Sequence, residues 1–266
     1  MPADTIFLKL GGSLLTDKTG FEALRPEITA RLAGEIAAAR RADSSLRLVL
    51  GHGSGSFGHV AGARHGTRSG VRGSEQWFGF AEVADAAARL NRIVVASLLS
   101  AGVPAVGLSS LVSARVTDGK ITYLNTDALR SALDENLVPV VYGDVAFDAV
   151  RGGTIISTEE IMEYLSAELS AAWLLLAGET PGVYDLQGNV IPLVTRQTLP
   201  VVLPALGASR GTDVTGGMAS KVLAMLDLVD AHPDLSVRIF SGLEIGLLQA
   251  ILLDPSLPSG TLLHYV

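Results

Sequence analysis

Three glycine-rich segments of this chain each carry a basic side chain, a combination that is typical of phosphate-binding sites. They occupy residues 9–13 (KLGGS), 51–59 (GHGSGSFGH) and 211–221 (GTDVTGGMASK). Glycine lets backbone N–H groups approach an anion closely, and lysine adds a compact positive charge. Only four of the 20 basic residues are lysines, and three of them, Lys9, Lys18 and Lys221, lie in or near the first and third segments. The chain is therefore expected to bind an anionic ligand.

The first segment follows an apolar stretch, residues 5–10, so its glycines are expected at the carboxyl end of a buried strand. Taken alone, this pattern is weak, because a glycine pair after a strand is more often a tight turn. It matches neither G-x-x-x-x-G-K-[ST] nor G-x-G-x-x-G, which disfavours a Walker loop and a Rossmann dinucleotide turn.

The second and third segments add different information. The second has four glycines and two serines in nine residues, more than a turn requires, and it ends at His59. A lone histidine is more often a structural hydrogen-bonding residue, but at the end of such a loop it can donate to a phosphate oxygen. The third segment opens a helix and places Lys221 about one turn inside it, where a capped helix with a solvated lysine is an equally good reading.

The remaining sequence alternates apolar strands with helical patterns. We expect strands at 5–10, 46–50, 103–108, 138–145, 172–178, 236–241 and 261–265, and helices at 26–41, 74–101, 126–135, 158–170 and 216–231. Turn signals at Asp118-Gly119 and Gly188-Asn189 predict two β-ribbons. This order predicts one α/β domain over residues 1–266, a single three-layer α/β/α sandwich around a largely parallel sheet.

Composition narrows the classes of partner. The 266 residues are 48% apolar, which suffices for a sizeable core, and the net charge of −7 argues against nucleic acid or an anionic membrane as a partner. The absence of cysteine excludes disulfides and thiolate chemistry. No signal peptide or membrane-spanning segment is recognisable, so a cytoplasmic location without membrane attachment is expected.

Several motifs in order along the chain resemble the amino-acid-kinase superfamily, and specifically its isopentenyl phosphate kinases. They are LKLGGSLLTDK (8–18), GHGSGSFGH (51–59), YGDV (142–145), PGVYD (181–185) and DVTGGMASK (213–221). The GSFGH part distinguishes isopentenyl phosphate kinases and the related fosfomycin kinases from carboxylate kinases. The resemblance implies the amino-acid-kinase fold, Mg²⁺-dependent transfer of the γ-phosphoryl of ATP to isopentenyl phosphate in isoprenoid biosynthesis, and a homodimer. It also implies an acceptor site within about 1–170 and a nucleotide site within about 171–266.

Site residues follow from matching these motifs position by position. The resemblance implies Lys9, Lys18, His59 and Lys221 as catalytic residues. Residues expected to bind ATP are Lys9, Gly11, Gly12, Ser13, Lys18, Gly55, Tyr184, Asp185, Gly216, Gly217 and Lys221. Residues expected to bind the acceptor are Gly53, Ser54, Gly55, His59, Gly143, Ser157 and Glu159, with Phe78, Phe80 and Val83 as an apolar wall for its tail. Ordinary core packing explains those three apolar positions equally well. No protein metal ligand is expected, because ATP phosphates would hold most of the Mg²⁺.

One departure from the family pattern and three alternatives remain. Where these kinases usually have Ser-Gly-Asp, this chain has Ser157-Thr158-Glu159, and we expect Glu159 to orient the lysines with a longer reach. A fosfomycin kinase or an amino-acid carboxylate kinase of the same fold is the nearest alternative. A non-catalytic nucleotide sensor or anion store is an alternative of a different class, and the retention of all three lysines argues against it.

Overall fold

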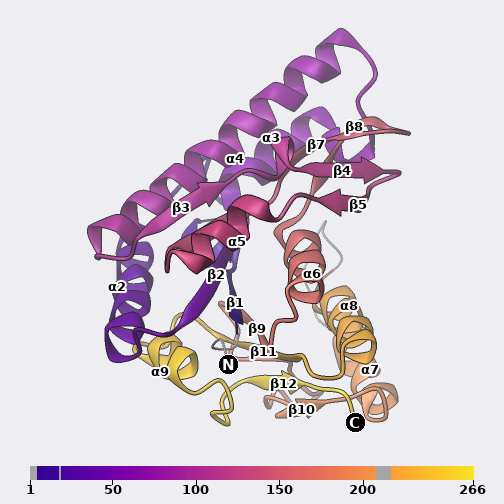
Figure 1. Ribbon diagram of the computed structural model, residues 1–266. Coiled ribbons are helices and arrows are strands. Elements are labelled where there is room, and N and C mark those ends of the chain that lie inside the picture. Colours follow the sequence, from indigo (N-terminus) through magenta and orange to yellow (C-terminus); the bar gives the residue numbers. More distant parts are fainter. Residues whose placement is uncertain (1–4, 18, 208–216) are drawn as a thin grey trace.

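The computed structural model describes residues 5–17, 19–207 and 217–266, and its centre is an eight-stranded sheet (Figure 1). The strand order is β10-β12-β11-β9-β1-β2-β6-β3, and neighbours are parallel except for the antiparallel pair β11–β12. The strands are β1 (Thr5–Leu10), β2 (Arg47–His52), β3 (Ala105–Leu108), β6 (Val138–Tyr142), β9 (Trp173–Gly178), β10 (Leu193–Val194), β11 (Ser236–Ser241) and β12 (Thr261–Leu263).

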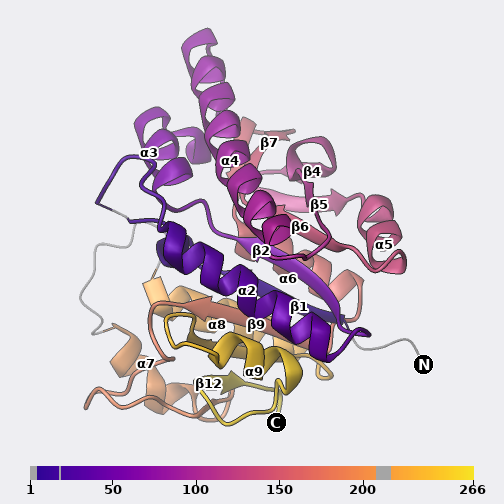
Figure 2. The same ribbon diagram turned by 90° about the vertical axis from the view of Figure 1, so that its left-hand side faces the viewer.

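Helices pack on both faces of this sheet. In the described residues they are α1 (Gly12–Leu15), α2 (Pro26–Ala42), α3 (Gly55–His65), α4 (Ser74–Ser100), α5 (Asp127–Asp134), α6 (Thr158–Glu168), α7 (Leu199–Gly207), α8 (Gly217–Ala231) and α9 (Leu247–Leu253), with 3-10 turns η1 (Thr67–Ser69) and η2 (Ser110–Val112). Figures 1 and 2 show α2 and α9 on one side of the central strands, and Figure 1 shows α6 and α8 on the other. None of the helices in the described ranges is long and apolar enough to cross a membrane.

The alternation of side chains along the strands explains why both faces are covered. On β1, Leu8 and Leu10 enter the core beneath α2, α4 and α9, whereas Phe7 enters the core beneath α5, α6, α7 and α8. All three are at most 3% exposed, as expected for a parallel strand buried on both faces. The predicted α/β fold around a largely parallel sheet is therefore confirmed, and the carboxyl ends of its parallel strands share one edge.

A second, four-stranded sheet was not predicted from the sequence. Its order is β5-β4-β7-β8, with β4 (Ala114–Thr117), β5 (Lys120–Leu124), β7 (Asp144–Asp148) and β8 (Gly152–Ile156). The expected single strand 138–145 is wrong, because the chain leaves the large sheet at Gly143 and continues as β7 of the small one. The apolar run is unbroken in the sequence, so periodicity alone does not reveal this break.

A single buried carboxylate organises the turns of the small sheet. Asp148 is 4% exposed and accepts hydrogen bonds from the backbone amides of Asp118, Gly119, Val150 and Arg151, at 2.6–3.0 Å. The predicted turn at Asp118-Gly119 is confirmed, and both residues have positive φ angles. The turn connecting β4 to β5 is thus held by polar contacts that reach across to the end of β7.

Candidate active site

The first two glycine-rich segments pack directly against each other at the carboxyl edge of the large sheet. A Cβ atom on Gly12 would lie 2.5 Å from the backbone N of Gly55, and one on Gly53 would lie 2.6 Å from the backbone N of Gly12. The Gly53 amide donates to Leu10 O at 2.9 Å. No side chain fits between these loops, so glycine is required by close backbone approach. The structure therefore brings two of the predicted phosphate-binding segments together.

Two hydroxyl groups hold these loops in register. Thr16 Oγ1 donates to Gly12 O at 2.9 Å and accepts from the Ser56 amide at 2.9 Å, and Ser56 Oγ accepts from the Ala23 amide at 3.1 Å. Gly55 has a φ of +49°, and a Cβ there would lie 2.1 Å from Thr16 Oγ1. These contacts fix the start of α3, which begins inside the segment that the sequence predicted as a loop.

The buried Lys9 and the partly exposed Glu159 form an ion pair at the edge of the same sheet. Lys9 Nζ lies 2.7 Å from Glu159 Oε1, and Lys9 as a whole is 6% exposed. Burial by itself would raise the pKa of Glu159, but the charges of Lys9 and Lys221 outweigh it and hold this pKa at about 2. Two of the three predicted phosphate lysines, Lys9 by direct contact and Lys221 through its charge, therefore keep the Glu159 carboxylate ionised.

The departure at residues 157–159 does not disturb the helix that follows. Ser157 caps α6: its Oγ accepts from the Glu160 amide at 3.2 Å, while the Glu160 carboxylate accepts from the Ser157 amide at 2.6 Å. Thr158 is 2% exposed and donates to His52 O at 2.6 Å. It also accepts from the amide of Gly143 at 2.8 Å, so this glycine lies beside the start of α6.

His59 and His52, both in the second segment, have different environments. His59 is exposed on the first turns of α3. His52 is 1% exposed and stacks on Tyr142 with ring centroids 5.6 Å apart. Burial lowers the pKa of His52 to about 4, so the ring is neutral near pH 7. Sequence reasoning selected His59 and passed over His52.

An apolar cluster lies beside α3. It contains two of the three residues predicted as an apolar wall, but not the third. Phe80 and Val83, 6% and 2% exposed, pack with Val71 and Val145, and partly buried neighbours include Ala61, Trp77, Leu111 and Ile155. Phe78 is 67% exposed and does not belong to this cluster. The prediction that Phe78 lines the wall is wrong, because its position on α4 faces solvent.

The expected nucleotide-binding residues lie at the ends of other elements. Gly11 follows β1 and its amide donates to Ala177 O at 2.8 Å, while Ser13 lies in α1. Tyr184 is 41% exposed, and Asp185 caps its own turn by accepting from the amides of Gln187 and Asn189. Gly217 and Lys221 lie in the first turns of α8. Lys18 and Gly216, also predicted for this site, lie outside the described residues.

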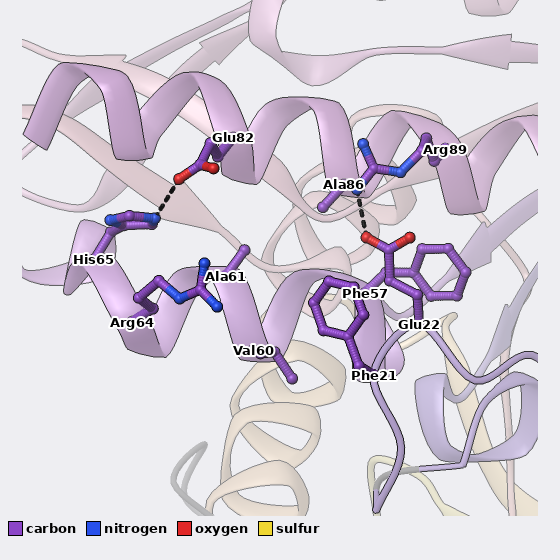
Figure 3. Close-up of a pocket in the computed structure, with 10 residues that line it drawn as sticks. All are labelled: Phe21, Glu22, Phe57, Val60, Ala61, Arg64, His65, Glu82, Ala86 and Arg89. Atoms are coloured by element: carbon purple, nitrogen blue, oxygen red, sulfur yellow. Dashed lines mark hydrogen bonds and ion pairs between the residues drawn. The ribbon is translucent and has the colours of Figure 1, made fainter.

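A separate pocket of about 70 Å³ lies between α3, α4 and the loop that carries Phe21 and Glu22 (Figure 3). Two ion pairs flank it, His65 with Glu82 at 2.6 Å and Arg89 with Glu22. Neither His59 nor Phe80 lines this pocket. It shares Ala61 with the apolar cluster that contains Phe80.

Comparison with known proteins identifies the family of the chain. The sequence profile described as the Amino acid kinase family matches residues 4–241. The chain belongs to the amino acid kinase family. The isopentenyl phosphate kinase of Haloferax volcanii is 41% identical over 84% of this chain and 88% of its own length. The isopentenyl phosphate kinase of Methanothermobacter thermautotrophicus is 35% identical over 85% of this chain and 87% of its own length.

A solved structure extends the similarity to three dimensions. The structure described as "X-ray structures of isopentenyl phosphate kinase" superposes with a TM-score of 0.82 at 28% identity, covering 97% of this chain and 99% of that one. The resemblance to isopentenyl phosphate kinases that the sequence motifs indicate is thereby confirmed. Within the described residues of the kinase, no group of three or more His, Asp or Glu side chains is placed to hold a metal ion.

One acidic residue of α6 was not anticipated. Glu163 lies one turn after Glu159, and burial raises its pKa to about 7, with Glu160, Glu159 and Asp227 adding to the effect. Its folded-state pKa therefore lies above its ordinary value of 4.5. The folded protein binds this proton more tightly than the unfolded chain, so Glu163 lowers stability as pH rises from about 4.5 to about 7.

We therefore expect Glu163→Gln to raise the melting temperature at pH 8, because glutamine carries no charge that must be buried. The gain should shrink steadily as pH falls and should vanish near pH 4.5. Thermal unfolding at several pH values measures this difference. Glu168→Gln, on the exposed end of the same helix, serves as the control and should show no such trend. Equal pH profiles for parent and Glu163→Gln would contradict the assignment.

Proposed function

We propose that the protein transfers the γ-phosphoryl group of ATP to isopentenyl phosphate, forming isopentenyl diphosphate for isoprenoid biosynthesis. The observation that carries the choice of acceptor is the two-sided environment of α3. One side exposes His59, and the other packs Ala61 against the apolar cluster that contains Phe80. Because residues two positions apart point to nearly opposite sides of a helix, we infer that the acceptor phosphate contacts His59 near the start of α3 and that its short hydrocarbon tail extends from there toward the apolar cluster. The relatives at 35–41% identity support the same acceptor.

The chemistry requires positioning and charge neutralisation more than proton transfer. A phosphate monoester has a second pKa near ~6, so its oxygen is already ionised at pH 7 and no general base is needed. We infer that Lys9 contacts the transferring phosphoryl group while it stays paired with Glu159, and that Lys221 contacts ATP phosphates. His59 and the amides around Ser54 and Gly55 would hold the acceptor phosphate.

The remaining expectations fit this proposal without being tested by it. Bound Mg²⁺ would neutralise phosphate charge, and because Glu159 is already paired with Lys9, we propose that ATP oxygens hold most of it. Lys18 and Gly216 are proposed for the nucleotide site on the family resemblance alone. The assignment of the acceptor to residues 1–170 and the nucleotide to 171–266, the homodimer and the cytoplasmic location stay predictions.

A coupled ATPase assay with three acceptors in parallel tests the proposal. Isopentenyl phosphate should give the highest kcat/KM, with dimethylallyl phosphate lower and fosfomycin lower still, because only the first two combine a monophosphate with a five-carbon tail. A preference for fosfomycin would favour the related resistance kinases instead. ATP binding without turnover of any acceptor would favour the non-catalytic alternative.

His59→Ala is expected to lower kcat/KM for isopentenyl phosphate by about 10- to 100-fold. Hydrogen bonds to charged groups contribute roughly 1.5–3 kcal/mol, which corresponds to this range. The fold and ATP affinity should survive, as measured by thermal unfolding and nucleotide titration. His65→Ala is the matched control on the same helix, since His65 pairs with Glu82 away from the proposed site. Similar losses in both variants would remove the role given to His59.

Substitutions on α4 test whether the apolar cluster limits the length of the acceptor tail. Phe80→Leu and Phe80→Ala should raise kcat/KM for a ten-carbon monophosphate relative to isopentenyl phosphate, since each accommodated CH₂ contributes up to about 0.8 kcal/mol. Phe78→Ala, two positions away but 67% exposed, should leave this ratio unchanged. A substrate series on all four proteins gives the ratios. If the Phe80 variants keep the parental ratio while remaining folded, the tail binds elsewhere.

A further inference from the structure

Thr158 uses its hydroxyl group to bridge two loops of the site. Its Oγ1 donates to His52 O at 2.6 Å and accepts from the amide of Gly143 at 2.8 Å. His52 ends β2 and Tyr142, next to Gly143, ends the neighbouring strand β6, and the two residues are partners in the parallel pairing. Thr158 therefore closes the gap at the point where these two strands stop and the site begins.

The groups joined by this bridge belong to both halves of the proposed reaction. His52 leads into Gly53 and Gly55, which are proposed to hold the acceptor phosphate. Thr158 is the first residue of α6, and the next residue, Glu159, forms the ion pair with Lys9. A shift of Thr158 relative to His52 would consequently change the distance between the acceptor loop and Lys9.

The loop end of the bridge is itself rigid. His52 Nδ1 lies 3.2 Å from Gly53 O, and its Nε2 lies 3.1 Å from the side-chain amide of Asn91 on α4. A neutral ring protonated on Nδ1 satisfies both contacts by donating to Gly53 and accepting from Asn91. The carbonyl group that Thr158 contacts is thus fixed from the α4 side as well.

We propose that Thr158 is a positioning residue that sets the acceptor loop at its working distance from the Lys9–Glu159 pair. The proposal rests on the function proposed above for the identity of the acceptor. Thr158 stands where the family usually has the glycine of Ser-Gly-Asp. In this chain the threonine hydroxyl group holds the loop that follows His52. Its methyl group fills the adjoining space, since a Cβ on Gly51 would lie 2.9 Å from Thr158 Cγ2.

Thr158→Val and Thr158→Ser separate the hydroxyl group from the packing. Valine keeps the branched shape but leaves the buried His52 carbonyl and Gly143 amide unpaired, whereas serine keeps both hydrogen bonds. Thr158→Val should raise KM for isopentenyl phosphate about 10-fold, with KM for ATP within about twofold of the parent. Thr158→Ser should stay within about threefold for both substrates. Equal KM values for parent and Thr158→Val, or equal losses for serine and valine, would overturn the proposal.

Thr261 provides a control with the same pair of bonds in a different place. It is fully buried on β12, donates to Ile191 O at 2.7 Å and accepts from the Val183 amide at 2.8 Å. Thr261→Val should lower the melting temperature to a similar extent and leave KM for isopentenyl phosphate unchanged. A rise of this KM in both variants would mean that lost stability, not loop position, causes the effect.

Hydrogen exchange provides a readout that does not depend on the identity of the acceptor. In the protein without substrates, amides of residues 53–58 should exchange faster in Thr158→Val than in the parent, Thr158→Ser and Thr261→Val. Unchanged exchange in Thr158→Val would overturn the positioning role whatever the assay shows. A parent protein that does not phosphorylate isopentenyl phosphate would overturn the proposed function alone, since the exchange result would still decide the role of Thr158.

Discussion

The ion pair between Lys9 and Glu159 is the contact on which the arrangement of the site depends. An ammonium group that is almost completely buried is costly unless a carboxylate lies within reach, and removing one partner of such a pair costs about 3–5 kcal/mol. Lys9 sits on the central strand β1, and Glu159 sits on the first turn of α6. Satisfying the charge therefore fixes the start of α6 against the edge of the large sheet. An arriving phosphate group can share Lys9 without a new cation having to be moved into place.

Close backbone contact is the second constraint. Two loops that are about 40 residues apart in the sequence meet with no side chain between them, and Thr16 and Ser56 hold them together through hydroxyl–backbone hydrogen bonds. The amides that would face phosphate are thus carried by two strands of one rigid sheet. Preorganised donors of this kind do not need to rearrange during the reaction, which is the condition for effective electrostatic stabilisation.

The sequence predicts the features that depend on residue type at a strand end. The glycines after β1 and β2 and the lysine on β1 are of this kind, because strand ends of a parallel sheet converge. His59 is predicted on a different basis, from its place at the end of a glycine-rich loop and from the family resemblance. Features that depend on a packing partner could not be predicted. Phe78 and Phe80 are equally apolar, and only the fold decides which one meets β8. The hydroxyl of Thr158 gave no signal either, since both of its partners are backbone groups distant in sequence.

At Gly143 the chain passes from the large sheet to the small one, and the two sheets carry different kinds of residue. The residues proposed to bind phosphate lie at the edge of the eight-stranded sheet, whereas Val145 on β7 and Ile155 beside it on β8 belong to the apolar cluster on the four-stranded one. The cluster shares no residue with β1, with β2 or with the two glycine-rich segments that follow them. This separation favours the evolution of new acceptor specificities. Substitutions in the small sheet and α4 can change the acceptor, while Lys9 and the glycine loops are retained.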